Sequence, residues 1–179
     1  MLFFTPYEAA AWAIIGHRIR ITQAATIKQR LATELGEHGA FPAPDRLAGL
    51  SAPQRGLTER KVEHLRTLSA AALGCKLGRD RLRAMAREEA MHDLQRLPGV
   101  GPFSAELILI RGVGDPDALP RHEQRLARAT RAAYELPDDA DVEPVAETWR
   151  PYRAWIALLV RAWLEAETGE IARGRGTMT

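Results

Sequence analysis

The sequence predicts an all-α fold, and three observations support this prediction. Apolar residues recur at the three- and four-residue spacing of a helix, as in residues 7–15 and 152–168. No stretch alternates between apolar and polar residues, so no β-sheet is expected. Segments rich in proline and glycine, such as residues 36–44, separate the apolar stripes as loops. A chain of 179 residues, 46% of them hydrophobic, can bury a sound core as one domain or as two small lobes that share an interface.

Helix start signals mark the elements in order along the chain. Thr5 followed by Pro6 opens the first helix, because threonine caps a helix and proline fits its first position. Thr22, Thr58 and Asp80 are the expected caps of three later helices. The expected helices are 7–15, 22–35, 44–50, 58–72, 80–85, 88–97, 104–112, 123–134 and 152–168, and residues 142–148 are expected to form a short helix or a turn.

The composition of the chain argues against several kinds of protein, namely disulfide-bonded, four-cysteine metal-binding and membrane-spanning ones. The single cysteine, Cys75, excludes an internal disulfide and a four-cysteine iron–sulfur or zinc site. No apolar run approaches the ~18 residues of a membrane helix, and the N-terminus lacks a signal peptide, so a cytoplasmic protein is expected. The formal net charge is only +2, but arginine far outnumbers lysine and binds phosphate well. A codon bias towards arginine is the alternative explanation. Residues 169–179 are expected to form a flexible tail.

The segment 97–105, Leu-Pro-Gly-Val-Gly-Pro-Phe-Ser-Ala, organises the rest of the chain. It joins the expected helices 88–97 and 104–112 by a tight turn, and Gly112 is expected to end the second helix. Apolar helices on both sides of a Pro/Gly turn predict a helix-hairpin-helix. An ordinary pair of antiparallel helices is the alternative.

The turn itself suits a phosphate group. Gly99 and Gly101 leave no Cβ in the way, so a phosphate can approach the backbone closely. Ser104 is the expected cap, and the first N–H groups of the second helix point outward at the turn. Together these groups form an anion site that grips the DNA backbone without reading its sequence.

The combined pattern resembles the helix-hairpin-helix superfamily of base-excision DNA glycosylases, most closely the branch of 3-methyladenine DNA glycosylase II. The resemblance covers about residues 6–165. It implies two helical lobes with the active-site cleft between them, within one catalytic domain over residues 1–179, and a hairpin motif at about 88–112. Four stretches carry it: 6–19, 56–65 with Gly-Leu-Thr-Glu-Arg-Lys, the hairpin continued to 120, and 149–153 with Trp-Arg-Pro-Tyr-Arg.

The resemblance implies that the protein binds double-stranded DNA that contains damaged bases. The chain is expected to be a monomer. The damaged nucleotide would flip out of the duplex, and a side chain from the turn after the first helix would fill the vacated space. In this chain that turn presents His17 and Arg18; for Arg18, a solvated charge at a helix end is the alternative. The hairpin residues that would contact the phosphate are Leu97, Gly99, Val100, Gly101 and Ser104.

In relatives, hairpin carbonyls bind a monovalent cation. Here those carbonyls would belong to Gln95, Leu97 and Val100, and the ion would be Na⁺ or K⁺. No other cofactor and no iron–sulfur cluster are expected.

The resemblance also implies a catalytic carboxylate shortly after the hairpin. The family pattern is Pro-x-x-Asp, and this chain reads Pro-Arg-His-Glu over residues 120–123, so Glu123 takes the position of the aspartate. Cleavage of an N-glycosidic bond builds positive charge on the sugar, which a nearby anion stabilises. Glutamate reaches roughly an ångström further than aspartate, and a misplacement of that size costs about 100-fold in rate. A favourable partner of the helix dipole is the alternative role of Glu123.

A pocket for a cationic base calls for aromatic faces. The candidates are Tyr7, Trp12, Phe103 and Trp155, while Leu107 stands where relatives place a tyrosine. A place in the core is the alternative for the aromatic residues, because apolar helical stripes need such side chains.

The expected function is therefore that of a monofunctional glycosylase of base excision repair, which hydrolyses the N-glycosidic bond of alkylated purines of the 3-methyladenine type. No lyase activity is expected, because no lysine precedes the hairpin turn where bifunctional relatives carry one. A helix-hairpin-helix protein that binds DNA or senses damage without chemistry is the second hypothesis. The third is an all-α interaction domain unrelated to DNA.

Overall fold

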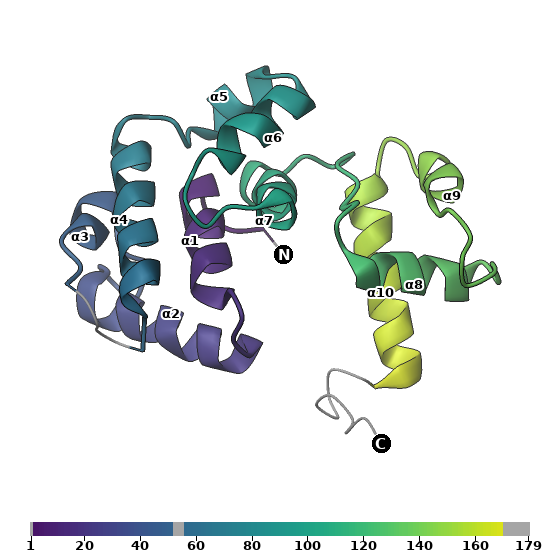
Figure 1. Ribbon diagram of the computed structural model, residues 1–179, viewed down its shortest axis with the longest axis horizontal. Coiled ribbons are helices and arrows are strands. Elements are labelled where there is room, and N and C mark those ends of the chain that lie inside the picture. The colour runs from purple at the N-terminus through teal and green to yellow at the C-terminus, as the bar shows by residue number, and fades with distance from the viewer. Residues whose placement is uncertain (1, 52–55, 170–179) are drawn as a thin grey trace. The chain divides into compact units, whose positions relative to one another are not determined.

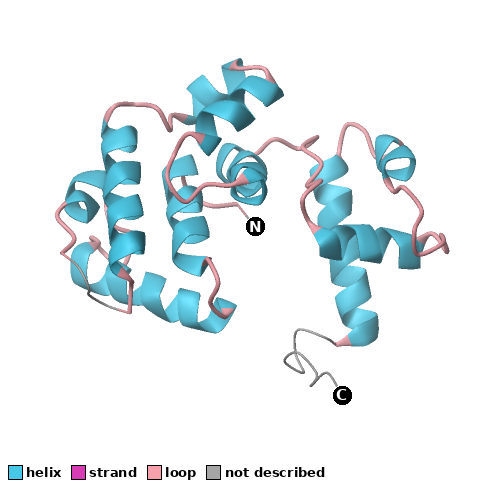
Figure 2. Cartoon of the chain, viewed as in Figure 1, coloured by secondary structure: helices cyan, strands magenta, loops and turns pink. Residues whose placement is uncertain are grey.

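Helices account for all the regular secondary structure in the parts of the chain that the computed structural model describes, residues 2–51 and 56–169 (Figures 1 and 2). The prediction of an all-α fold is confirmed. None of the helices in these ranges is long and apolar enough to cross a membrane. The tail expected at 169–179 falls, except for Gly169, outside the described residues. The chain divides into two compact units, residues 1–114 and 115–179, which we call unit 1 and unit 2.

Unit 1 contains the helices up to the end of the hairpin. They are α1 (Pro6–Gly16), α2 (Ile21–Leu35), α3 (Pro44–Ala48), α4 (Glu59–Leu73), α5 (Arg79–Ala84), α6 (Arg87–Gln95), α7 (Pro102–Leu107) and the π-helix η1 (Ile108–Val113). Helix α1 packs against α2, α4, α7 and η1. Because neighbours surround it, α1 buries residues on several faces, among them Ala10, Ala11, Ile14 and Ile15.

Two of the expected caps are confirmed. The Oγ1 atom of Thr5 accepts a hydrogen bond from the N–H of Glu8 at 3.1 Å, and Pro6 occupies the first turn of α1. Thr58 accepts from the N–H of Lys61 at 3.3 Å at the start of α4. Each bond satisfies one of the N–H groups that a helix start leaves unpaired.

Two other expected caps are wrong. The N-cap of α2 is Arg20, two residues before the expected cap, so Thr22 lies inside the first turn. Helix α5 takes Gly78 as its N-cap, and Asp80 also lies inside the first turn, where its negative charge still favours the positive end of the helix dipole.

The second hairpin helix differs from the prediction at both ends. Its N-cap is Gly101, and Ser104 lies buried inside its first turn. After α7 the backbone widens into η1, which ends at Gly114 with a φ of +81°. Gly112 therefore does not cap the helix. It allows close packing instead, because a Cβ atom there would lie 2.7 Å from the Cα atom of Pro6.

Unit 2 contains α8 (Gln124–Ala133), α9 (Glu143–Glu147) and α10 (Arg153–Thr168). Helices α8 and α10 pack against each other, and Figure 1 shows them crossing. The core of this unit is small and is made by Leu119, Leu126, Ala146, Trp149 and Ala157. The indole N–H of Trp149 also donates to the hydroxyl of Tyr134 at 2.9 Å.

Candidate functional site

The hairpin turn follows α6 and places Gly99 in the left-handed region, with a φ of +83°. Glycine adopts this conformation without steric cost, as the sequence predicts. The N–H of Val100 donates to the carbonyl of Leu97 at 3.1 Å, and the Val100 side chain is buried in the core of unit 1. The turn itself thus uses the N–H of Val100, and the phosphate contact expected of this residue stays a prediction.

His64, a residue of α4, packs directly against the turn. A Cβ atom on Gly99 would lie 2.4 Å from the Nδ1 atom of His64, so only glycine fits beneath the imidazole. Burial lowers the pKa of His64, the charges of Arg60 and His17 lower it further, and Glu63 opposes them. The sequence gives no signal for this contact, since His64 lies 35 positions before Gly99.

The start of α7 offers backbone donors to an anion. Pro102 takes the first helical position and has no N–H, so the donors there belong to Gly101, Phe103 and Ser104. The carbonyl of Gly101 accepts from the N–H of Ala105 at 2.9 Å, which fixes the direction of the first turn. The sequence prediction missed the N–H of Phe103, although a proline at the first position signals that the donors begin one residue later.

A second turn, residues 16–20, lies at the end of α1 and carries two predicted residues, His17 and Arg18. Both are exposed, and Arg18 has a φ of +56°. The ammonium group of Lys61 donates to the carbonyls of Ile15 at 2.7 Å and of His17 at 2.8 Å. These carbonyls belong to the end of α1, where a cation is favoured. Lys61 thus fastens this turn to α4, and partial burial lowers its pKa.

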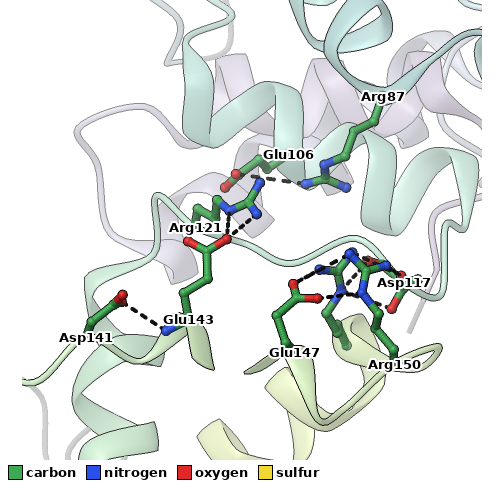
Figure 3. Close-up of polar contacts among 9 residues, drawn as sticks. Arg87, Glu106, Asp117, Arg121, Asp141, Glu143, Glu147 and Arg150 are labelled. Atoms are coloured by element: carbon green, nitrogen blue, oxygen red, sulfur yellow. Dashed lines mark hydrogen bonds and ion pairs between the residues drawn. The ribbon is translucent and has the colours of Figure 1, made fainter. Parts of the chain in front are cut away.

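In unit 2, an arginine cluster holds the loop that leads to Glu123. Arg153 is only 6% exposed and contacts both carboxylate oxygens of Asp117 at 3.0 Å. Arg150 contacts the same carboxylate at 2.5 Å and Glu147 at 2.6 Å. Figure 3 shows Asp117, Glu147 and Arg150 converging. Both arginines belong to the Trp-Arg-Pro-Tyr-Arg stretch, so this motif secures the loop before the proposed catalytic residue.

The same loop is held a second time, by Arg121. Its guanidinium pairs with the carboxylate of Glu143, with an Nε–Oε1 distance of 3.0 Å (Figure 3). The N–H of Glu143 in turn donates to Asp141 at 3.0 Å. The first turn of α9 is thereby joined to the residue two positions before Glu123.

Glu123 occupies the N-cap position of α8, at the predicted helix start. Within the described part of the chain its side chain makes no capping hydrogen bond with α8. The carboxylate extends to α10 instead, where its Oε1 lies 2.8 Å from the Nη1 of Arg161. The Glu123 side chain is 15% exposed, so the pair is shielded from water on most sides but remains reachable.

The base-pocket candidates occupy three places. Tyr7 and Trp12 line a cavity of about 750 Å³ in unit 1, whose walls come from the N-terminal segment, α1, α2, residues 39–44 and Arg111. Burial raises the pKa of Tyr7 to about 12, so this phenol stays neutral at physiological pH. Phe103 on α7 is 50% exposed, and Leu107 at its end packs on the unit 1 core. Trp155 on α10 is 52% exposed.

Comparisons with known proteins find DNA glycosylases of similar sequence and similar fold. No family model matches the chain. The chain is 30% identical over 167 residues to DNA-3-methyladenine glycosylase 2 of Escherichia coli, covering 85% of this chain and 55% of that protein. The chain spans about half the length of the curated relatives it matches.

Solved structures share the fold. A DNA-3-methyladenine glycosidase from Bacillus halodurans superimposes with a TM-score of 0.78 at 22% identity, covering 97% of this chain and 80% of that one. The 3-methyladenine DNA glycosylase of Schizosaccharomyces pombe, in complex with abasic DNA, gives 0.73 at 20% identity, covering 90% and 81%. The chain is therefore similar in sequence to DNA-3-methyladenine glycosylases and shares the fold of these solved glycosylases.

Proposed function

We propose that the protein is a monofunctional DNA N-glycosylase that removes alkylated purines of the 3-methyladenine type from double-stranded DNA. The observation that carries this proposal is the Glu123 carboxylate, held away from its own helix at the start of α8 and only 15% exposed. The relatives named 3-methyladenine glycosylases support the substrate class. The proposed substrate places the protein at chromosomal DNA.

In the proposed reaction, the flipped nucleotide presents its N-glycosidic bond to Glu123. An alkylated purine is already cationic and leaves readily, so no strong general acid is required. As the bond breaks, positive charge develops on the sugar, and the carboxylate stabilises that charge or activates a water molecule against it. The neutral base departs, and water completes the hydrolysis at the sugar.

We propose that the hairpin binds a phosphate group of the damaged strand. A side chain of the second turn, residues 16–20, would fill the space that the flipped nucleotide leaves in the duplex. The donors at the start of α7 are the N–H groups of Gly101, Phe103 and Ser104, and Gly99 lets the phosphate come close. Arg18 lies in the turn that Lys61 holds to α4, exposed and in the left-handed conformation. A guanidinium can stack on a base and contact phosphate, which suits the proposed wedge.

The family cation also remains a proposal. Carbonyl oxygens are the ligands that hard monovalent cations prefer, and Gln95 belongs to the last turn of α6, where carbonyls leave the helix unpaired. The carbonyl of Leu97 accepts one hydrogen bond from Val100 and retains a second lone pair. Gln95, Leu97 and Val100 therefore fit Na⁺ or K⁺, which would stiffen the turn and offset phosphate charge.

A second function follows from the same contact that supports the first. The Arg161 guanidinium at 2.8 Å offsets part of the Glu123 charge, and glutamate stands in place of the family aspartate. A protein of this fold that binds damaged DNA without cleaving it would have the same hairpin and the same arginine cluster. Base release separates the two functions.

The test is release of free base from methylated duplex DNA by the wild-type protein and by Glu123→Gln. We expect the glutamine variant to lose at least about 100-fold in rate, because an amide keeps the shape and loses the charge. DNA affinity should stay within a factor of about three. Glu167→Gln, an exposed substitution on α10, is the matched control. Release that is undiminished in Glu123→Gln would refute the proposal, and salt-sensitive binding without release would support the second function.

A further inference from the structure

Glu123 carries one more rotatable bond than the family aspartate, so its carboxylate has more freedom of orientation. The structure shows an ion pair from α10 to this carboxylate, with the Nη1 atom of Arg161 2.8 Å from the Oε1 atom of Glu123. The two residues lie 38 positions apart and meet because α8 packs on α10, with Leu126 and Ala157 in the shared core of unit 2. An ion pair with an N–O distance of 2.8 Å is a close contact that can orient both side chains.

We propose that Arg161 is the positioning residue of the proposed catalytic carboxylate: its guanidinium fixes the Glu123 side chain in one orientation. This inference rests on the proposed function. Arg161 contacts neither substrate nor the reacting atoms in this role, and acts only through Glu123. The extra reach of glutamate is then compensated, because the anchor on α10 removes the freedom that the additional methylene introduces.

The surroundings of the pair distinguish Arg161 from the other charges nearby. Arg125 and Arg128 on α8 and Glu165 on α10 line a shallow hollow beside Arg161, and His122 precedes Glu123 in the chain. Arg125 is exposed, whereas the side chain of Arg161 is 33% exposed. A partly shielded pair is screened less by salt than an exposed one. Arg125 therefore provides a control substitution with the same change of charge at the same hollow.

The experiment compares Arg161→Gln, Arg161→Lys and Arg125→Gln with the wild-type protein. The single-turnover rate of base release at saturating protein should fall roughly 10- to 100-fold in Arg161→Gln. Affinity for the methylated duplex should change by less than about threefold, as in Arg125→Gln, whose rate stays near that of the wild type. The acid limb of the pH–rate profile should move to higher pH in Arg161→Gln, because the carboxylate loses its neighbouring cation. Arg161→Lys should recover part of the rate.

Three results would overturn the proposal. They are an unchanged rate in Arg161→Gln, a faster rate, which would make Arg161 a brake on the site, and equal losses in the lysine and glutamine variants with an unmoved acid limb. Carbon-13 titration of the Glu123 carboxyl by NMR keeps this test separate from the proposed function. If the wild type releases no base, the proposed function fails, while a raised Glu123 pKa in Arg161→Gln still supports the pair. An unaltered titration refutes it.

Discussion

Unit 1 and unit 2 are each stabilised internally by a different kind of interaction. Unit 1 packs aliphatic and aromatic side chains from α1 to η1 into one continuous core, in which Ile15, Leu31 and Leu65 are completely buried. Unit 2 has a much smaller apolar core around Trp149 and relies on the arginine cluster with Asp117 and Glu147. Small helical units bury too little surface to be stable on packing alone.

This difference corresponds to the kind of group that each unit would offer to DNA in the proposed function. Unit 1 presents backbone N–H groups, which are fixed once the helices are packed around α1. Unit 2 presents a carboxylate on a side chain, and side chains are fixed by directional ion pairs such as those of Glu123, Arg121 and Asp117. The site in unit 2 should accordingly respond to salt and acid, and the turn in unit 1 to changes of volume.

The largest effect on stability should come from Arg153→Met. Arg153 is 6% exposed, and this change removes its bidentate bonds to Asp117 and its contact with Glu147, leaving Arg150 as the partner of both carboxylates. We therefore expect unit 2 to lose about 3 kcal/mol in free energy of unfolding. Urea titration followed by tryptophan fluorescence measures the loss. Arg150→Met, whose side chain is 53% exposed, should cost far less. Equal losses in the two variants would mean that burial does not decide the strength of the cluster.

Gly99→Ala should have the next largest effect. The new Cβ atom would lie 2.4 Å from the His64 imidazole and the residue would keep a positive φ, so we expect a loss of about 2 kcal/mol and a disordered turn. Thermal unfolding and duplex binding are the measurements. Gly101→Ala is the stability control, because a Cβ there meets nothing within 4 Å and φ is −92°. If Gly99→Ala is as stable as Gly101→Ala, the turn and the His64 side chain can move enough to accommodate the Cβ atom.

The smallest effect concerns the pH dependence of His64. Its pKa is lowered in the folded state, so the unfolded state binds more protons between that lowered pKa and 6.5. The free energy of unfolding should therefore fall as the pH drops through this window. The melting temperature should drop between pH 8 and about pH 5.5, and this drop should be smaller in His64→Gln than in the wild-type protein. If the melting temperatures of the wild type and His64→Gln differ by the same amount at both pH values, His64 is not the source of the pH dependence.

The local features of the fold could be predicted from the sequence. Thr5 and Thr58 cap helices as expected, since capping depends on residues three positions apart. The same local reasoning predicts a helix end at Gly112, and this prediction is wrong. The small size of this glycine serves packing against Pro6, which lies more than a hundred residues earlier in the chain.

The candidate site shows the same limit. The position of Glu123 at a helix start and the glycine turn could be read from spacing. The contacts that shape them could not, because Arg161 and His64 approach through helix packing across 38 and 35 positions. The internal hydrogen bond of Val100 likewise depends on the conformation of the whole turn, which residue types alone do not determine.

The π-helix η1 has a consequence for the comparison of relatives. A π-turn holds one residue more than an α-turn, so a relative whose hairpin helix is α-helical throughout would match this chain only with a gap of one residue between Ile108 and Val113. An ungapped alignment would pair Gly112 with the wrong neighbour. It would also shift every equivalence after η1 by one position, the one proposed for Glu123 included, unless the loop that follows restores the register.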